Sequence, residues 1–410
     1  MSLSLRSLTE NDYPAWMRVD EEAFGNAFPP HRWELFKNLV ELDRSLGAFD
    51  GEELVGAVCL CGFTMTVPGG VAPVAGVTAV AVLPSHRRRG ILSGLMTRQL
   101  AVLRERGESI AALYASEAAI YGRFGFGRAA DTLAFDIPTH RSAFVGNAPV
   151  DPSLRLRLVD PVAARSTFEK VFEAGLDSRP GIYARTQTRW DSMLSDQESD
   201  RGDAGVLRAV VVEDDEGPRG YALFRIKPSF TVHDVPDGEL RLKELIGLDP
   251  AAYALLWRHV LDRDLVTRVT AGMRPSDDPL IHLLAEPRHL NAAWLDELWV
   301  RLVDVERALP LRRYSAPVDV VIEVEDPVCP WNARRWRLTF DTQQARCVPA
   351  DDAEADLVMP VSVLSAAYMG GRPLAATQAA GLVRETREGA VRRLSTAMSW
   401  DPAPWCGLVF

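Results

Sequence analysis

The sequence predicts a mixed α/β or α+β fold divided into about two to four domains. Its 410 residues are too many for one hydrophobic core, because a single domain commonly holds about 100 to 200 residues. Short apolar runs typical of strands alternate along the chain with stretches of helical periodicity. Hydrophobic residues make up 47% and charged residues 25%, which is the composition of an ordinary globular protein.

The first elements are two helices followed by three strands. Thr9 opens a capping-box-like start for a helix that ends at Gly25, and a second helix follows the prolines at 29–30. The strands are expected at residues 46–49, 54–65 and 74–83, with turn residues at 50–51 and 68–70. A helix closed by Gly107 and a buried strand at 110–115 complete this block.

A basic turn, His-Arg-Arg-Arg-Gly at residues 86–90, joins the third strand to the helix that starts at Ile91. The free N–H groups and the positive dipole end of a helix start favour an anion, and the arginines add full charges. A pyrophosphate would suit this turn, although a solvated basic face explains the residues equally well. The spacing Arg87-x-x-Gly90 resembles the acyl-CoA signature of GNAT acetyltransferases, but Leu92 departs from the usual Gly or Ala of that signature.

A second motif follows the strand at 110–115. Residues 121–127 read Tyr-Gly-Arg-Phe-Gly-Phe-Gly and resemble the Y-G-R-F-G-[YF]-G element of the Eis (enhanced intracellular survival) family of bacterial N-acetyltransferases. The basic turn, the opening residues 7–12 and the terminal Phe410 are also similar to that family. The order of two helices, three strands, a helix and a strand fits a GNAT fold, so the resemblance covers the whole chain.

The remaining chain is expected to form two further domains. A Pro- and Gly-punctuated linker at 138–152 ends a first domain at 1–150, and residues 151–302 look like a degraded echo of it. The echo is expected to have helices at 161–174 and 181–194, strands at 206–212, 221–227, 239–246 and 266–273, and a helix beginning at Asp249-Pro250. That acidic cap would repel a diphosphate and the proline removes a donor, so this half should bind no CoA. The last domain, 303–410, reads as α+β, with strands at 318–324 and 336–340 and helices near 361–369, 374–382 and 387–398.

The resemblance implies tandem GNAT-like domains, a sterol-carrier-like C-terminal domain, and acetyl-CoA as cosubstrate. It places the acetyl and pantetheine groups at the backbone of Val80 and Val82. It lines the diphosphate site with Arg87, Arg88, Gly90 and Ile91, and it adds Ser116 to the cofactor-binding residues.

For the chemistry, Tyr121 is the candidate acid, because a phenol of pKa ~10 can donate to a departing thiolate. A packed core tyrosine would explain the same pattern. The Eis resemblance implies that Tyr121 is the general acid and that the C-terminal carboxylate of Phe410 takes the proton of the amine. The apolar chain end from Trp405 to Phe410 agrees with its burial, but it would equally suit a docked C-terminal strand.

Amines are the expected acceptors, and a cationic small molecule such as an aminoglycoside or a polyamine is favoured. Phe24, Asn26 and Trp33 are the candidate substrate-binding residues. Other possible wall or rim residues are Trp16, Asp20, Glu21 and Glu22, although these four, like Phe24 and Trp33, also have a plain explanation as helix residues. Asn26 and Val409 stand where family members carry acidic residues, so protein lysines stay open as acceptors. The net charge of -10 is compatible with cationic substrates.

Several other classes are disfavoured. The negative net charge argues against nucleic acid, and no apolar run reaches the ~18 residues of a membrane span, so we expect a cytoplasmic protein without membrane insertion. The five cysteines are scattered and indicate neither disulfides nor a metal site. Family resemblance implies a homohexamer. The alternative function is a catalytically weak acyl-CoA- or lipid-binding interaction protein.

Overall fold

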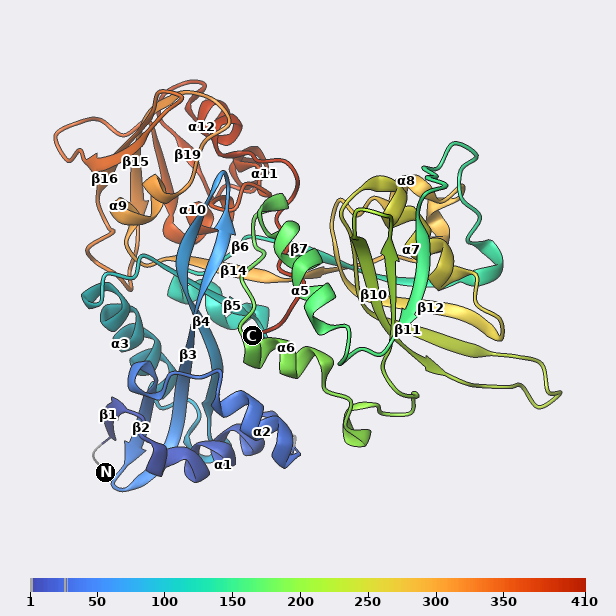
Figure 1. Cartoon of the computed structure of the whole chain (residues 1–410). Coiled ribbons are helices and arrows are strands. Elements are labelled where there is room, and N and C mark those ends of the chain that lie inside the picture. Colours follow the sequence, from blue (N-terminus) through green and yellow to red (C-terminus); the bar gives the residue numbers. More distant parts are fainter. Residues whose placement is uncertain (1–2, 26, 28) are drawn as a thin grey trace. The chain divides into compact units, whose positions relative to one another are not determined.

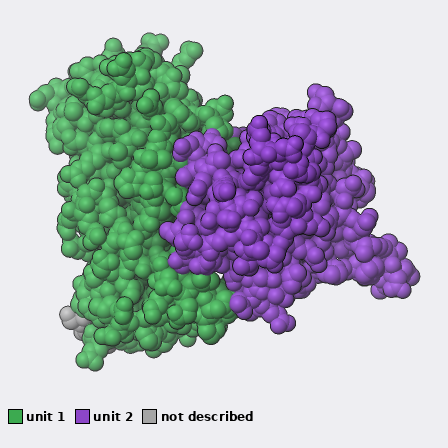
Figure 2. All heavy atoms as spheres, in the orientation of Figure 1, with its two compact units in different colours: residues 1–130, 179–184, 296–410 green, residues 131–178, 185–295 purple. Residues whose placement is uncertain are grey.

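The computed structural model describes residues 3–25, 27 and 29–410. Two compact units emerge from it, coloured separately in Figure 2. Unit 1 holds residues 1–130, 179–184 and 296–410, and unit 2 holds 131–178 and 185–295.

A seven-stranded sheet in unit 1 has the order β1-β2-β3-β4-β5-β14-β6 (Figure 1). Its strands are β1 Leu3–Ser7, β2 Leu46–Asp50, β3 Glu53–Val67, β4 Gly70–Val82, β5 Ile110–Tyr114, β6 Gly127–Arg128 and β14 Leu298–Leu302. Its helices are α1 Tyr13–Phe24, α2 Pro30–Lys37, α3 Ile91–Glu105 and α4 Ala118–Tyr121. The expected αα-βββ-α-β order is present, but it is preceded by strand β1, which was not predicted from the sequence and which pairs with β2.

Helices α1 and α3 cover opposite faces of this sheet. A Cβ at Gly56 of β3 would lie 3.2 Å from a methyl group of Ile91, the first residue of α3. Side chains alternate along a strand, so Cys59, three residues further along β3, faces the other side, where α1 packs on β3 and β4. We call these the α3 face and the α1 face.

Two strands lie in sheets that local sequence did not indicate. Strand β7, Asp131–Pro138, falls inside the expected first domain, 1–150, yet it pairs antiparallel with β12 in unit 2. Strand β14 falls inside the expected second segment, 151–302, yet it pairs with β5 in unit 1, Leu298 opposite Tyr114. A strand pattern shows that a segment is extended, but not which sheet supplies its partner.

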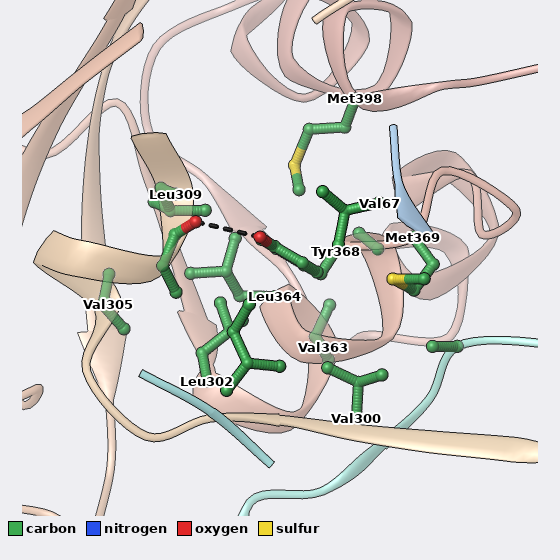
Figure 3. Close-up of a cluster of buried hydrophobic side chains, with 14 of the residues drawn as sticks. Val67, Val300, Leu302, Val305, Leu309, Val363, Leu364, Tyr368, Met369 and Met398 are labelled. Atoms are coloured by element: carbon green, nitrogen blue, oxygen red, sulfur yellow. Dashed lines mark hydrogen bonds between the residues drawn. The ribbon is translucent and has the colours of Figure 1, made fainter. Parts of the chain in front are cut away.

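The C-terminal part of unit 1 forms a five-stranded sheet of order β17-β16-β15-β18-β19. Its elements are α9 Val305–Ala308, β15 Val318–Glu325, β16 Arg335–Phe340, β17 Ala345–Pro349, β18 Leu357–Pro360, α10 Val361–Ala367, α11 Leu374–Ala379, β19 Arg384–Glu385 and α12 Ala390–Met398. Its core is continuous with the β3–β4 hairpin: Val67 lies among Leu302, Leu364 and Met398, while the Tyr368 hydroxyl donates to the Ala308 carbonyl at 3.0 Å (Figure 3).

Unit 2 contains the sheet β13-β7-β12-β11-β10-β9-β8 and its own hydrophobic core. Besides β7, its elements are β8 Arg155–Val159, α5 Arg165–Ala174, α6 Gln187–Leu194, β9 Arg208–Glu213, β10 Pro218–Lys227, β11 Gly238–Gly247, α7 Pro250–Leu261, β12 Val266–Pro275, α8 Leu280–Leu283 and β13 Ala293–Asp296. The helix expected at 181–194 begins only at Gln187, capped by the side chain of Thr186. None of the helices in the described ranges is both long and apolar enough to cross a membrane.

Candidate active site

Strands β4 and β5 separate soon after they meet. Within the described chain they pair in parallel at two positions, Ala75 with Ala111 and Gly76 with Ala112. Thr78, Ala79, Val80 and Val82 of β4 are partly exposed, and only Ala81 among residues 78–82 is buried, although β4 is a central strand. The divergence leaves one backbone edge of β4 free to bind a ligand.

A bulge turns that free edge into a set of donors. Val58 of β3 faces both Ala79 and Val80, and Ala79 has a positive φ of 45°. The amide of Leu83 donates to Val55 of β3 at 2.9 Å. Amides alternate in direction along a strand, so those of Val82 and Val80 point away from β3, toward the opening beside β5. These are the two residues at which the family resemblance implies binding of the acetyl and pantetheine groups.

The basic turn ends at the N-terminus of α3, as its sequence predicts. Gly90 has φ 79° and caps the helix, and a Cβ at this position would meet no atom within 4 Å. The first bond within the helix runs from the Gly94 amide to the Gly90 carbonyl, so the amides of Ile91, Leu92 and Ser93 have no carbonyl partner in the helix. These donors and the open space fit a diphosphate.

The arginines of the turn divide into two roles. Arg89 pairs with Asp50 at 3.3 Å, and His86 lies 3.5 Å from the same carboxylate, so Asp50 fixes one side of the turn. Arg87 makes one long contact, 3.4 Å to the Ala23 carbonyl, and Arg88 pairs with no acid among the described residues. Both remain available to an anion.

Tyr121 closes α4 and is buried in the core of the first sheet. Burial raises the pKa of its phenol above the ordinary value, and a hydrogen bond with Ser116 opposes that rise. Phe126 packs edge-on against the ring, with centroids 6.1 Å apart. The hydroxyl is therefore protonated at neutral pH, as a proton donor must be.

The chain end lies against the first sheet. The phenyl ring of Phe410, 6% exposed, packs on Phe63 of β3 with centroids 4.8 Å apart, and Tyr183 packs on both rings. A Cβ at Gly76 would lie 2.5 Å from the Phe63 ring. Gly76 is the last residue of β4 that pairs with β5. The ring of Phe63 therefore lies between Phe410 and the point where the two strands separate.

Backbone bonds hold the tail and the Tyr183 segment in this place. The amides of Cys406 and Gly407 each donate to the buried carboxylate of Glu297 at 2.9 Å, and Trp405 donates to Pro180. Residues 181–184 in turn exchange backbone hydrogen bonds with 64–66 of β3. The terminus is thus ordered by groups from three distant parts of the sequence.

In unit 2, strands β11 and β12 separate as β4 and β5 do, but a side chain occupies the gap between them. Strands β11 and β12 pair from Gly238 to Leu242 and then separate, and Arg274 of β12 donates to the Leu245 carbonyl of β11 at 3.3 Å across the gap. Asp249 caps α7, as expected, by accepting from Ala252, and its carboxylate lies 3.3 Å from Arg219. The position equivalent to the basic turn therefore carries an acid, and the gap holds a side chain.

The candidate acceptor residues lie in different environments. Phe24 is exposed at the end of α1, whereas Trp33 is 3% exposed, packs on Trp16 and Phe36, and donates to Glu21 at 3.3 Å. Asn26 lies outside the described residues. The five cysteines are buried and form no disulfide, and within the described chain no group of His, Cys, Asp and Glu could hold a metal ion.

Sequence reasoning missed three contributors: Phe63, Tyr183 and Arg274. Phe63 follows Cys59 and Cys61 in a strand whose alternation only marks a buried face. Tyr183 lies in a segment expected to be helical. Of the three, only Arg274 could have been noticed in the sequence, because it is a cation at the end of an apolar strand.

Comparisons with known proteins agree with this geometry. Residues 4–129 and 181–302 each match an acetyltransferase (GNAT) domain family, and 305–407 match a sterol carrier protein domain. An uncharacterized N-acetyltransferase of Streptomyces avermitilis is 44% identical over 99% of both chains, and N-acetyltransferase Eis of Mycobacterium tuberculosis is 32% identical over 98% of both. The crystal structure of Eis1 from Mycobacterium abscessus superposes with a TM-score of 0.84 at 33% identity, covering 99% of this chain and 100% of that one.

Proposed function

The chain belongs to the Eis family of GNAT N-acetyltransferases, and we propose that it transfers acetyl from acetyl-CoA directly to an amine of a cationic small molecule. Its fold class is the predicted one, two GNAT domains followed by a sterol-carrier domain. It is an acetyltransferase, and GNAT domains use acetyl-CoA as cosubstrate. The acceptor, the direct transfer and the residue roles are our proposal.

The observation that supports the proposal is the free backbone edge of β4 beside the donor-rich turn before α3. Unit 1 also contains Tyr121 and the terminal Phe410, to which we assign the two proton transfers. The amides at Ile91 and the side chains of Arg87 and Arg88 bind the diphosphate. The amides of Val80 and Val82 hold the acyl end at the divergence of β4 and β5. Ser116 bonds the Tyr121 hydroxyl and so orients it.

The chemistry requires one proton to leave the amine and one to reach the sulfur. The acetyl thioester supplies the activated carbonyl. The carboxylate of Phe410 accepts the amine proton, through a water molecule where the two do not touch, and the Tyr121 hydroxyl donates a proton to the departing sulfur. The amine nitrogen gains the acetyl group as the carbon–sulfur bond breaks, so both substrates react while bound together.

Aminoglycosides and polyamines are the acceptor classes we favour. The lipid-binding alternative is less well supported, because Met65 and Val67 of the β3–β4 hairpin pack into the core of the sterol-carrier domain. The family resemblance also supports a homohexamer, which light scattering would test. The expected cytoplasmic location would be tested by cell fractionation.

Release of the CoA thiol tests the function directly. The chain is mixed with acetyl-CoA and a panel of amines that includes an aminoglycoside, a polyamine and a lysine peptide. Thiol release that depends on a cationic small molecule, with the acetylated product seen by mass spectrometry, is expected. Binding of acetyl-CoA without release for any amine would favour the binding-protein alternative.

A further inference from the structure

A buried carboxylate on α1, that of Asp20, has no partner among the residues that the structure describes. Asp20 is 4% exposed, and it makes no hydrogen bond or ion pair with any residue of the described chain. One helical turn earlier, the indole N–H of Trp16 is also buried without an acceptor. Buried polar groups are nearly always paired, because an unpaired one loses its hydration without replacement. Such a carboxylate is suited to binding a cation from outside the chain.

Asp20 lies beside the divergence of β4 and β5. It interacts electrostatically with Cys59 of β3, and Cys59 is the register partner of Thr78 on β4. Thr78 directly precedes the bulge at Ala79 and Val80. Asp20 therefore points at the α1 face of the segment whose amides we assign to the acyl group.

The terminal residue shares this face. Phe63, on which Phe410 packs, is four residues from Cys59 on β3 and has the same alternation, so both side chains point to the α1 face. Four residues of extended strand span about 13 Å. Asp20 and the ring of Phe410 thus lie along one stretch of the sheet.

The acceptor must approach on this face. The diphosphate site begins at the N-terminus of α3, whose first residue Ile91 lies on the α3 face, while Arg87 of the same turn reaches the Ala23 carbonyl at the end of α1. We place the acyl end of the cosubstrate on the α3 side of the divergence. The opposite side of the acyl group remains for the amine. An amine that meets two separated anions there is bound best when it carries two positive charges.

The charged state of Asp20 fits a cation-binding role. Burial raises its pKa to about 6, and the neighbouring Glu21 adds to the rise. The buried thiol of Cys59 also interacts electrostatically with Asp20, and Tyr13 interacts electrostatically with that thiol. The Lys37 ammonium lies over the ring of Tyr13, 5.0 Å from its centroid, rather than against Asp20. At neutral pH Asp20 is therefore an anion, and no cation of the described chain forms an ion pair with it.

We propose that Asp20 binds a second, non-reacting ammonium group of a di- or polycationic acceptor, while the reacting amine lies near the carboxylate of Phe410. This assignment rests on the proposed function, because it presupposes that the opening beside Val80 is the transfer site. It makes Asp20 a residue that determines acceptor specificity. It also supplies negative charge to an acceptor site in which Asn26 and Val409 are neutral.

Equilibrium binding tests the proposal without requiring turnover. Affinities of cadaverine and butylamine for the full chain loaded with CoA are measured by calorimetry for the wild type, Asp20→Asn and Glu22→Gln. Glu22 is an exposed acid on the same helix, so its variant makes the same change in net charge. Loss of a buried counter-charge should weaken cadaverine binding by about ten- to hundredfold in Asp20→Asn.

The expected pattern has three parts. Butylamine affinity should be the same in all three proteins, Glu22→Gln should bind cadaverine as the wild type does, and wild-type affinity for cadaverine should fall as the pH drops through about 6. Cadaverine affinity unchanged in Asp20→Asn, or an equal loss for both amines, would overturn the proposal. Absence of thiol release in the wild type would instead overturn the proposed function. The cadaverine measurements would still show whether Asp20 binds an ammonium group.

Discussion

Replacing Asp20 by Asn should stabilise the protein at neutral pH and leave its stability unchanged in acid. The pKa of this carboxyl rises on folding from 3.8 to about 6, mainly through burial. Between those two values the folded chain binds more protons at Asp20 than the unfolded chain, so stability falls as the pH rises through this window. A rise of roughly two pKa units at about 1.4 kcal/mol each gives about 3 kcal/mol at neutral pH. Asn still buries a polar group, so we expect a gain of about 1 to 3 kcal/mol.

Scanning calorimetry across this pH range measures the effect. The gain corresponds to a rise of ~2 to 4 °C per kcal/mol in the melting temperature of the transition that contains α1. The difference between Asp20→Asn and wild type should be near zero below pH 3.8 and reach its plateau above about 6. Glu22→Gln, at an exposed position, should show no such pH dependence. A destabilised Asp20→Asn, or a constant difference at every pH, would refute the reasoning. If Asp20→Asn both stabilises the protein and weakens diamine binding, the charge of Asp20 contributes to binding at a cost in stability.

Three further predictions concern the cosubstrate. Arg87→Ala should weaken acetyl-CoA binding by about 1.5 to 3 kcal/mol through loss of a charge-assisted bond, while acceptor binding is little changed; calorimetry showing full affinity in the folded variant would remove Arg87 from the diphosphate site. Tyr121→Phe should lower turnover by about 10²- to 10⁴-fold with acetyl-CoA affinity and melting temperature preserved, and near-normal turnover would make Tyr121 an ordinary core residue. Titration should give one acetyl-CoA per chain, because Arg274 fills the gap of the second half and Asp249 caps α7; two equivalent sites would contradict this.

The parts of the fold that follow from local pattern could be predicted from the sequence. The helix after Thr9, the strand before the basic turn, and the helix that begins at Ile91 all lie where periodicity and capping residues indicate. The exchange of β7 and β14 could not be predicted. Asp131–Pro138 reads as a strand in either sheet, and its partner Val266–Pro275 is more than a hundred residues away.

The same limit applies to the site. Residues 86–90 predict an anion site, because the charges, the glycine and the helix start are neighbours in sequence. Asp20, Glu21 and Glu22 are three consecutive acids that sequence cannot rank. Packing of α1 on the sheet buries Asp20 and leaves Glu22 in solvent. The contact of Phe410 with Phe63 and Tyr183 also depends on tertiary structure, although the apolar tail was a signal that the chain end is buried.

The role of the terminal carboxylate is tested most directly by adding one Gly after Phe410. The extension turns the carboxylate into a neutral amide and moves the new chain end away from Phe63, while the cosubstrate groups around residues 80–91 are untouched. We predict that turnover falls sharply, that acetyl-CoA affinity is unchanged, and that the loss is smallest at high pH, where more of an amine of pKa ~10 is already deprotonated. A Gly added at the N-terminus should have no effect. Equal turnover of the extended and native chains at every pH would contradict the account and leave the amine proton to another acceptor.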